Sequence, residues 1–423
     1  MKRSLSIRSV AAFGALLLLV GCGPKEPPKT AKDVKSGEVD LTAPPAQPKR
    51  NLSGEAKGDF KKALGRYRQE AKTGVNKTNC ADLAGAFGDV YADFPNVVEA
   101  KFNEGVIWEK CGEKGKAEEV YQAILRKHPN HGPTLNNLGQ MLYEKGQSGA
   151  ALSYFQKAAA AKNSEGYVNL AMIQRDRALR GDTESLREAV NNIHRALAVD
   201  SFNIEAYNTL ATLIYDHARS KSKLEMARLI CLQAIKQRPD FAPVYNVLGL
   251  VLLKMGRVTP ALAEFRKAAE RDANLVDAQM NIAAVTLSFR DYTSAEEAYR
   301  RVLSLNPSKK VRYSATVGLG VALRGQRKFD QAMAQYKAAE KIDSSNADIY
   351  YNMGILVQDY TFDAANPGKG IGQLREASGY LNRYLSAARD KTQVEDARRR
   401  IKNINEMIPM LQEQQRMMSQ SGQ

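Results

Sequence analysis

The chain has 423 residues, of which 62 are lysine or arginine and 46 are aspartate or glutamate, so its formal net charge is +16. The positive charges are spread along the chain, and no block of like charges forms a basic tail of the kind that binds nucleic acid. With 43% hydrophobic residues, the chain is long enough for a conventional core or for a repeat array without one central core.

The beginning of the chain has the pattern of a secretory signal. Three basic residues precede an apolar run over residues 10–20, which stops just before Cys22. This run is shorter than the roughly 20 residues that a membrane-spanning helix needs. The sequence therefore predicts a signal peptide over residues 1–21, and losing its three basic residues lowers the net charge to 16 − 3 = +13.

The junction over residues 19–22, Leu-Val-Gly-Cys, resembles the lipobox of bacterial lipoproteins. The resemblance implies a diacylglycerol thioether on Cys22 and acylation of the new amino terminus, and several acyl chains anchor a protein stably. Gly23 is not the Asp that resembles an inner-membrane retention signal. We therefore expect the protein at the inner leaflet of the outer membrane, facing the periplasm, with the inner membrane as the alternative. A conventional signal peptide with an unrelated Cys22 also stays open.

The stretch behind Cys22 differs in composition from the rest of the chain. Residues 23–58 are rich in Pro, Lys, Ser and Gly and contain hardly any large apolar side chain. Such a segment cannot bury enough apolar surface to fold, and its prolines favour extended backbone. We expect residues 22–58 to be a disordered tether that reaches on the order of 100 Å when fully extended.

A repeated pattern follows. A Leu-Gly pair or its equivalent is followed at fixed offsets by a small residue, an aromatic residue and another small or apolar residue. Four copies are Leu138-Gly139, Ala151, Phe155, Ala158; Leu248-Gly249, Ala261, Phe265, Ala268; Ile282-Ala283, Ala295, Tyr299, Val302; and Leu319-Gly320, Ala332, Tyr336, Ala339. The spacing resembles the tetratricopeptide repeat, a helix-turn-helix unit of about 34 residues. That resemblance implies an all-α fold, a right-handed superhelical α-solenoid with N-terminal and C-terminal capping helices.

Packing explains why these residue types recur. A small residue in the first helix of a repeat (helix A) allows the second helix (helix B) to approach closely, and the small residue of helix B lies opposite it. We expect the aromatic residue four positions later to fill the space toward the next repeat. Proline near the end of the unit, as at Pro129, Pro239 and Pro307, is expected to end helix B.

The register divides the rest of the chain. Eight repeats are expected over residues 98–390, beginning near Val98, Gly132, Ser164, Ile204, Ala242, Val276, Tyr313 and Ala347. Residues 59–97 are expected to form a degenerate helical pair. Residues 391–423 are expected to form a C-terminal capping helix, kinked or ended at Pro409, and a tail, with a coiled-coil contact to a partner as the alternative. Extra residues are expected in the turn between helix A and helix B at 180–183, 220–222 and 361–372.

Helix A lines the concave groove of such arrays, so its residues are the candidate binding site. The expected groove residues are Phe102, Val106, Asn136, Gln140, Tyr143, Asn208, Tyr215, Asn246, Leu250, Leu253, Met280, Leu287, Tyr351 and Ile355. The mixture of apolar and amide side chains indicates a helix or an extended peptide as the ligand. Packing against neighbouring helices is the alternative interpretation for each residue.

Three cysteines follow Cys22. Cys80 lies near the start of a helix B and Cys111 near the end of the following helix A, so both are expected at one edge of the array, where they could form a disulfide. Cys231 occupies a packing position and is expected to be a buried small hydrophobe.

The sequence contains no catalytic motif, so no enzyme activity, cofactor or small-molecule substrate is expected. His128 and His131 lie three residues apart in a turn, but no further metal ligands cluster near them, so no metal site is expected.

These features predict a non-enzymatic, lipid-anchored periplasmic scaffold that binds envelope proteins through its groove. The layout resembles the lipoproteins of myxobacterial adventurous gliding motility, which implies a place in a gliding machine. Two alternatives stay open, a pilotin-like or outer-membrane assembly factor for a secretin, type IV pilus or barrel proteins, and an enzyme subunit such as a cell-wall hydrolase activator. Because the protein is expected to be secreted, nucleic acid is not expected as a partner. The expected contact with the membrane is made by the lipid on Cys22.

Overall fold

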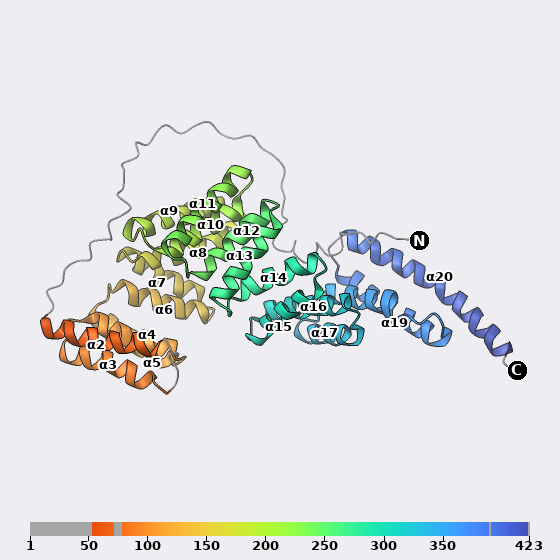
Figure 1. Ribbon diagram of the computed structural model, residues 1–423, viewed down its shortest axis with the longest axis horizontal. Coiled ribbons are helices and arrows are strands. Elements are labelled where there is room, and N and C mark those ends of the chain that lie inside the picture. The colour runs from red at the N-terminus through yellow and green to blue at the C-terminus, as the bar shows by residue number, and fades with distance from the viewer. Residues whose placement is uncertain (1–52, 72–77, 389–390, 422–423) are drawn as a thin grey trace. The chain divides into compact units, whose positions relative to one another are not determined.

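The computed structural model describes residues 53–71, 78–388 and 391–421 (Figure 1). The expected signal peptide, Cys22 and the tether up to residue 52 lie outside these residues. Within them, all regular secondary structure is helical, which confirms the all-α repeat fold predicted from the sequence. Among the described residues, none of the helices combines the length with the hydropathy that a membrane-spanning helix requires.

The described residues divide into two compact units. The N-terminal unit extends to Val251 and the C-terminal unit begins at Leu252, so that the boundary falls inside α12 (Ala242–Lys254).

The N-terminal unit is a series of antiparallel helical pairs. Its helices before α12 are α2 (Gly54–Glu70), α3 (Cys80–Asp93), α4 (Val98–Lys110), α5 (Lys114–Lys127), α6 (Gly132–Glu144), α7 (Ser148–Ala160), α8 (Ser164–Ala178), α9 (Thr183–Val199), α10 (Ile204–His217) and α11 (Lys221–Gln237).

The C-terminal unit continues the series and ends in three longer or irregular elements. After α12 come α13 (Val258–Arg271), α14 (Val276–Ser288), α15 (Tyr292–Ser304), α16 (Lys309–Gly325), α17 (Phe329–Ile342), α18 (Asp348–Ile355), the π-helix η2 (Leu356–Thr361), α19 (Pro367–Ala387) and α20 (Lys391–Ser421).

Local residue types explain where the helices begin and turn. The side chains of Asn163 and Asn203 accept hydrogen bonds from backbone N–H groups in the first turns of α8 and α10, at 2.8 and 2.9 Å, and so satisfy donors that the helix leaves unpaired. In the turns after α6 and α12, Gly146 and Gly256 have φ of 77° and 79°, a region that favours glycine.

The small residue of helix A is packed against the aromatic residue of helix B in the same repeat. A Cβ atom on Gly139 would lie 2.6 Å from the ring of Phe155, and one on Gly105 would lie 2.5 Å from the ring of Tyr121. The aromatic side chain therefore fills space within its own repeat, which the sequence interpretation did not include. Contact toward the next repeat is also present, since the Asn137 side chain donates a 2.9 Å hydrogen bond to the Tyr121 hydroxyl.

The extra residues between helix A and helix B lengthen helices more than they lengthen turns. Helices α9 and α11 each have 17 residues, whereas α7 has 13. In the last pair, the residues expected as a loop contribute to η2 and to the 21-residue α19. Residues 180–182 and 362–366 thus lie in turns as expected, whereas 221–222 and 367–372 are helical.

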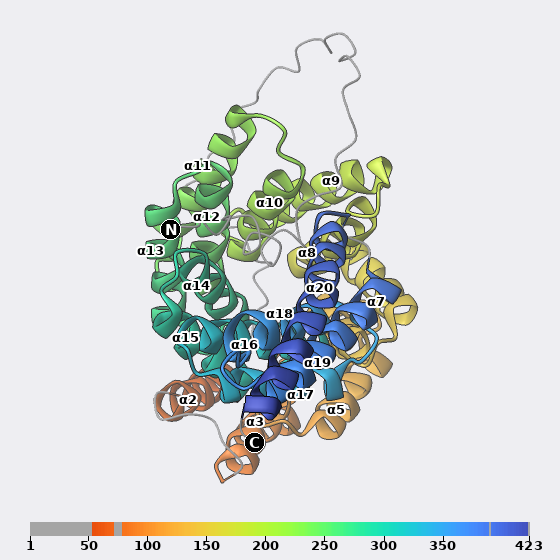
Figure 2. The ribbon, with the colours of Figure 1, turned by 90° about the vertical axis from the view of Figure 1, so that its right-hand side faces the viewer.

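The C-terminal helix α20 lies along α19, as Figures 1 and 2 show, and buries Ala397, Ile404 and Leu411 at seven-residue spacing. The helix continues through Pro409 as far as Ser421, so of the two expected effects of Pro409, a kink or an end of the helix, the end is wrong.

Candidate functional site: the helix-A face of the N-terminal unit

The first helices of three consecutive repeats, α6, α8 and α10, contact one another in the N-terminal unit. Two large apolar side chains on these helices are exposed to solvent: Tyr143 of α6 and Met172 of α8 are each 40% exposed. We call the partly or fully exposed side chains on this side of α4, α6, α8 and α10 the helix-A face: Phe102, Val106, Asn136, Gln140, Tyr143, Asn169, Met172, Arg175, Asn208 and Asp216.

Amide side chains link the helices of this face. Asn169 of α8 donates a 2.8 Å hydrogen bond to the side-chain oxygen of Asn136 on α6. One repeat earlier, the Tyr121 hydroxyl donates to a carboxylate oxygen of Glu109 at 2.9 Å. Burial raises the pKa of Tyr121 well above its usual range, so this phenol stays a neutral hydrogen-bond donor.

Asn208 of α10 is different. Its side-chain Oδ1 atom is buried and accepts no hydrogen bond from any described residue. An amide oxygen buried without a donor costs about 1–3 kcal/mol. A peptide N–H that met this oxygen, after rotation of the amide, would remove that cost.

One ion pair joins two helices of the face. Arg175 of α8 and Asp216 of α10 form an ion pair at 2.5 Å, with side chains only 23% and 10% exposed. A pair this shielded is costly to break, because one partner would be left buried and uncompensated. This pair is therefore not available to a ligand, which leaves the exposed side chains of Tyr143 and Met172 and the amide side chains of the face for contact.

The predicted groove residues separate into two groups. The partly or fully exposed ones are Phe102, Val106, Asn136, Gln140, Tyr143, Asn208, Leu250, Leu253 and Met280. The buried ones are Tyr215, Asn246, Leu287, Tyr351 and Ile355. The groove interpretation needs correction for these five, because their side chains are enclosed by the protein itself and are not open to a partner.

Tyr351 shows the reason most clearly. Its hydroxyl donates a 2.8 Å hydrogen bond to Asp396 of α20, and its ring lies 5.0 Å from that of Tyr384 on α19. The C-terminal helices thus cover this part of the helix-A row. The nearby Ile355 ends α18, where the chain changes to the π-helix.

Three residues of α8 were missed by the sequence interpretation. Met172 and Arg175 occupy the ninth and twelfth positions of the repeat that begins at Ser164, the same positions that supplied residues in the other repeats. The register alone could have found them. Asn169 lies one position later than the corresponding Asn136 and Asn208, so only the structure reveals its pairing.

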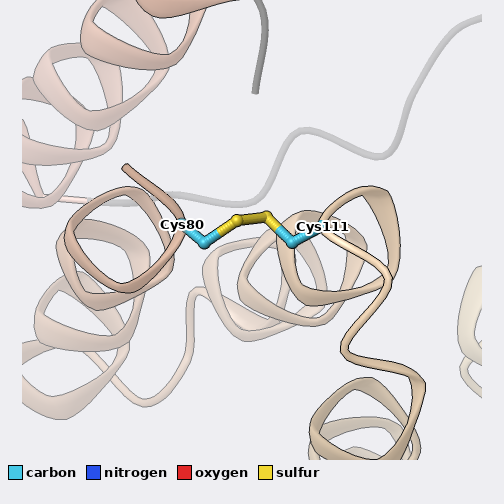
Figure 3. The surroundings of a disulfide bond; sticks show 2 residues. All are labelled: Cys80 and Cys111. Atoms are coloured by element: carbon cyan, nitrogen blue, oxygen red, sulfur yellow. A yellow bond between two sulfur atoms is a disulfide. The ribbon is translucent and has the colours of Figure 1, made fainter. Parts of the chain in front are cut away.

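The disulfide lies at the N-terminal end of this unit. Cys80, the first residue of α3, is bonded to Cys111, which caps the carboxyl end of α4, with a Cα–Cα distance of 6.3 Å (Figure 3). Cys231 is free and fully buried, and burial raises the pKa of its thiol to about 12. This thiol is therefore protonated and shielded at neutral pH.

The described residues contain no group of three or more His, Cys, Asp or Glu side chains able to hold a metal ion. The predicted lipid site, Cys22, lies outside the described residues, so its modification stays a prediction.

Comparison with known families identifies the repeats. Family models described as "TPR repeat" and "Tetratricopeptide repeat" match residues 320–359, 113–166, 242–275 and 276–309. The chain contains tetratricopeptide repeats. They lie in both units, over helices that the spacing of small and aromatic residues had indicated.

Curated relatives match the chain at low identity. The protein O-mannosyl-transferase TMTC3 of Homo sapiens is 25% identical over 256 residues, which cover 57% of this chain and 27% of the relative. Protein FlbA of Caulobacter vibrioides is 25% identical over 287 residues, which cover 63% of this chain and 46% of the relative. The chain thus spans between about a quarter and a half of the length of these relatives.

Among solved structures, a monomeric mutant of IFIT1 with Gppp-AAAA has a TM-score of 0.52 and 16% sequence identity to this chain, covering 79% of this chain and 87% of that one. At this identity the similarity shows the fold alone.

Proposed function

We propose that this chain is a non-enzymatic scaffold that binds a partner polypeptide along the helix-A face of the N-terminal unit. Tetratricopeptide repeats suit protein binding, since a row of helices presents an extended surface on which apolar anchors and polar groups alternate. The observation that carries the proposal is the combination of exposed Tyr143 and Met172 with the unsatisfied amide oxygen of Asn208.

An extended peptide fits these groups chemically. Tyr143 and Met172 would cover apolar side chains of the ligand, and methionine adapts its shape to different partners. The amide of Asn208 would bond the ligand backbone, whose N–H and C=O groups are otherwise unsatisfied once water is excluded.

Site-specific photocrosslinking tests this face. A photoreactive phenylalanine analogue placed at Tyr143 or Met172 is expected to capture a partner from native membranes. Phe202 is the matched control, because it is 44% exposed but lies in the turn between α9 and α10. The captured segment, synthesised as a peptide, should bind the purified chain, and Asn208→Ala should weaken that binding about tenfold. Equal capture at Phe202, or peptide binding indifferent to Asn208→Ala, would refute the proposed site.

We further propose that the scaffold is held at the membrane by lipid on Cys22 and faces the periplasm from the outer membrane. The lipobox-like junction and the proline-rich stretch behind it support this placement. Cys22→Ala should release the protein from membranes and abolish palmitate labelling. Labelling that persists in this variant would refute lipidation at Cys22.

We propose that the scaffold belongs to a gliding-motility complex, because the layout of the sequence resembles that of gliding-motility lipoproteins. Deleting the gene is expected to abolish gliding. Loss of secretin multimers or of barrel insertion, with gliding intact, would instead assign the protein to envelope assembly.

A further inference from the structure

Helix α11 carries an apolar stripe on the side that faces away from the protein. Its buried residues are Leu224, Ala227, Cys231 and Ala234, and α11 packs on α10 (Figure 1). Met226, Leu229 and Leu232 are 47%, 54% and 40% exposed. At the helical angle of about 100° per residue, these three lie opposite the centre of the buried face.

Basic residues frame this stripe. Residues 219–238 contain six Lys or Arg and one Glu, a net charge of 6 − 1 = +5. The one acid, Glu225, is bonded to Arg228 of the same helix. The exposed lysines at the ends of the helix, Lys221 and Lys236, fall on the same side as the apolar stripe.

A helix of this kind has two separate means of contact with a lipid surface. The apolar side chains can enter the boundary between headgroups and acyl chains, while the basic side chains bind anionic headgroups. The positive charge around the stripe complements an anionic surface, and α11 exposes no Trp, Tyr or Phe of the kind that anchors most protein interfaces, so a lipid surface fits this helix better than a shaped protein pocket.

We propose that the exposed face of α11 docks the N-terminal unit onto an anionic lipid bilayer. The helix lies in the plane of the interface, with Met226, Leu229 and Leu232 inserted and the lysines at its two ends against headgroups. This contact is independent of the proposed lipid on Cys22 and of the proposed peptide site. The helix-A face belongs to the other helices of the unit, so a partner can be bound while α11 lies on the membrane.

Vesicle co-sedimentation tests the proposal. The full chain with Cys22→Ala is used, so that no covalent lipid contributes to binding. This protein should bind phosphatidylcholine vesicles that contain about 30% phosphatidylglycerol at least about tenfold more strongly than vesicles of phosphatidylcholine alone. Raising NaCl from about 0.1 to about 0.5 M should weaken the binding, because salt screens the attraction between lysines and headgroups.

Apolar insertion is tested by a triple substitution of exposed residues, which leaves the core intact. M226Q/L229Q/L232Q should lower the partition coefficient about tenfold without changing the circular dichroism spectrum. The matched control removes three apolar side chains of similar exposure from other surfaces, Leu179→Gln, Phe202→Gln and Phe289→Gln, and should bind as before.

The charge contribution is tested in the same way. Removing three lysines around α11 with K221Q/K223Q/K236Q should abolish the preference for phosphatidylglycerol. Removing three exposed lysines of the C-terminal unit, with K309Q/K310Q/K341Q, should preserve it.

Absence of vesicle binding, or binding that is equal in the two apolar triple variants, would overturn the proposal. If M226Q/L229Q/L232Q instead lost a protein partner while vesicle binding was absent, the face would be a protein interface and the lipid proposal would be wrong. These results can be distinguished from failure of the proposed peptide-binding site, because that site is tested separately by peptide binding to the Asn208→Ala variant.

Discussion

Glu296 of α15 links one repeat of the C-terminal unit to the next through hydrogen bonds and an ion pair. Its side chain is only 8% exposed and accepts hydrogen bonds from Gln326 at 2.7 Å, from Lys328 at 3.0 Å and from Arg300 at 2.8 Å. Gln326 and Lys328 lie in the turn between α16 and α17. The perturbation is Glu296→Gln, which keeps the size of the side chain and removes its charge.

The expected magnitude follows from the pKa of Glu296. Burial by itself would raise this pKa, but the hydrogen bonds from Gln326, Lys328 and Arg300 outweigh it and lower the pKa from 4.5 to about 2. A difference of that size corresponds to about 3 kcal/mol. Since Lys328 and Arg300 are about half exposed and partly screened by water, we expect Glu296→Gln to cost about 2–3 kcal/mol at pH 7.

The sign of the pH dependence follows from a lowered carboxylate pKa. The stabilisation is fully present above the ordinary pKa of 4.5 and is lost as the pH falls toward about 2. The gap in unfolding free energy between the wild type and the variant should therefore narrow steadily over this range. Urea unfolding followed by circular dichroism, at a series of pH values, measures it.

The neighbouring Glu297 supplies the matched control, because it lies on the same helix and is exposed. Glu297→Gln should change the free energy of unfolding by less than about 0.5 kcal/mol. Equal effects of the two substitutions, or a gap for Glu296→Gln that does not depend on pH, would refute the reasoning.

Three further predictions concern the N-terminal unit. Replacing Cys80 and Cys111 by Ala removes a cross-link over 31 residues and should cost about 3–4 kcal/mol, measured by urea unfolding beside the wild type treated with reductant. Gly139→Ala should cost about 1–3 kcal/mol, because the added Cβ would lie 2.6 Å from the Phe155 ring; an unchanged melting temperature would contradict this packing. In a chain without the lipid-site thiol, Cys231 should resist a thiol reagent at pH 8 until urea unfolds the protein, and rapid reaction of the native chain would argue against its burial.

The sequence was most informative where packing depends on the size of a single residue. At positions such as Gly139 there is no room for a larger side chain, because the facing helix lies too close. The spacing of these small residues therefore indicates where each helix of a repeat lies in the sequence. Six first helices, α4, α6, α8, α10, α12 and α14, begin at the residues where this spacing placed the starts of repeats. Helix α16 begins earlier, at Lys309 rather than Tyr313, because the residues after Pro307 add a turn to its amino end.

The candidate site was predictable in its chemistry but only partly in its members. Position within a helix tells which way a side chain points and not what lies opposite it. Tyr143 and Tyr351 are both aromatic residues at groove positions, yet the first is 40% exposed and the second 7%. The difference comes from the two helices that follow α18, because Tyr384 of α19 packs against the Tyr351 ring and Asp396 of α20 accepts a hydrogen bond from its hydroxyl.

The same limit applies in reverse to α11. The repeat pattern predicts that Leu224, Ala227 and Cys231 pack against the neighbouring helix. Met226 and Leu229 are apolar as well, so apolar residues occur on nearly every side of this helix. A helix that is apolar all round is usually buried on all sides. Only the structure shows that Met226, Leu229 and Leu232 face solvent, with lysines at both ends of the helix. Exposed apolar residues next to basic residues are what make this helix a candidate lipid-binding surface.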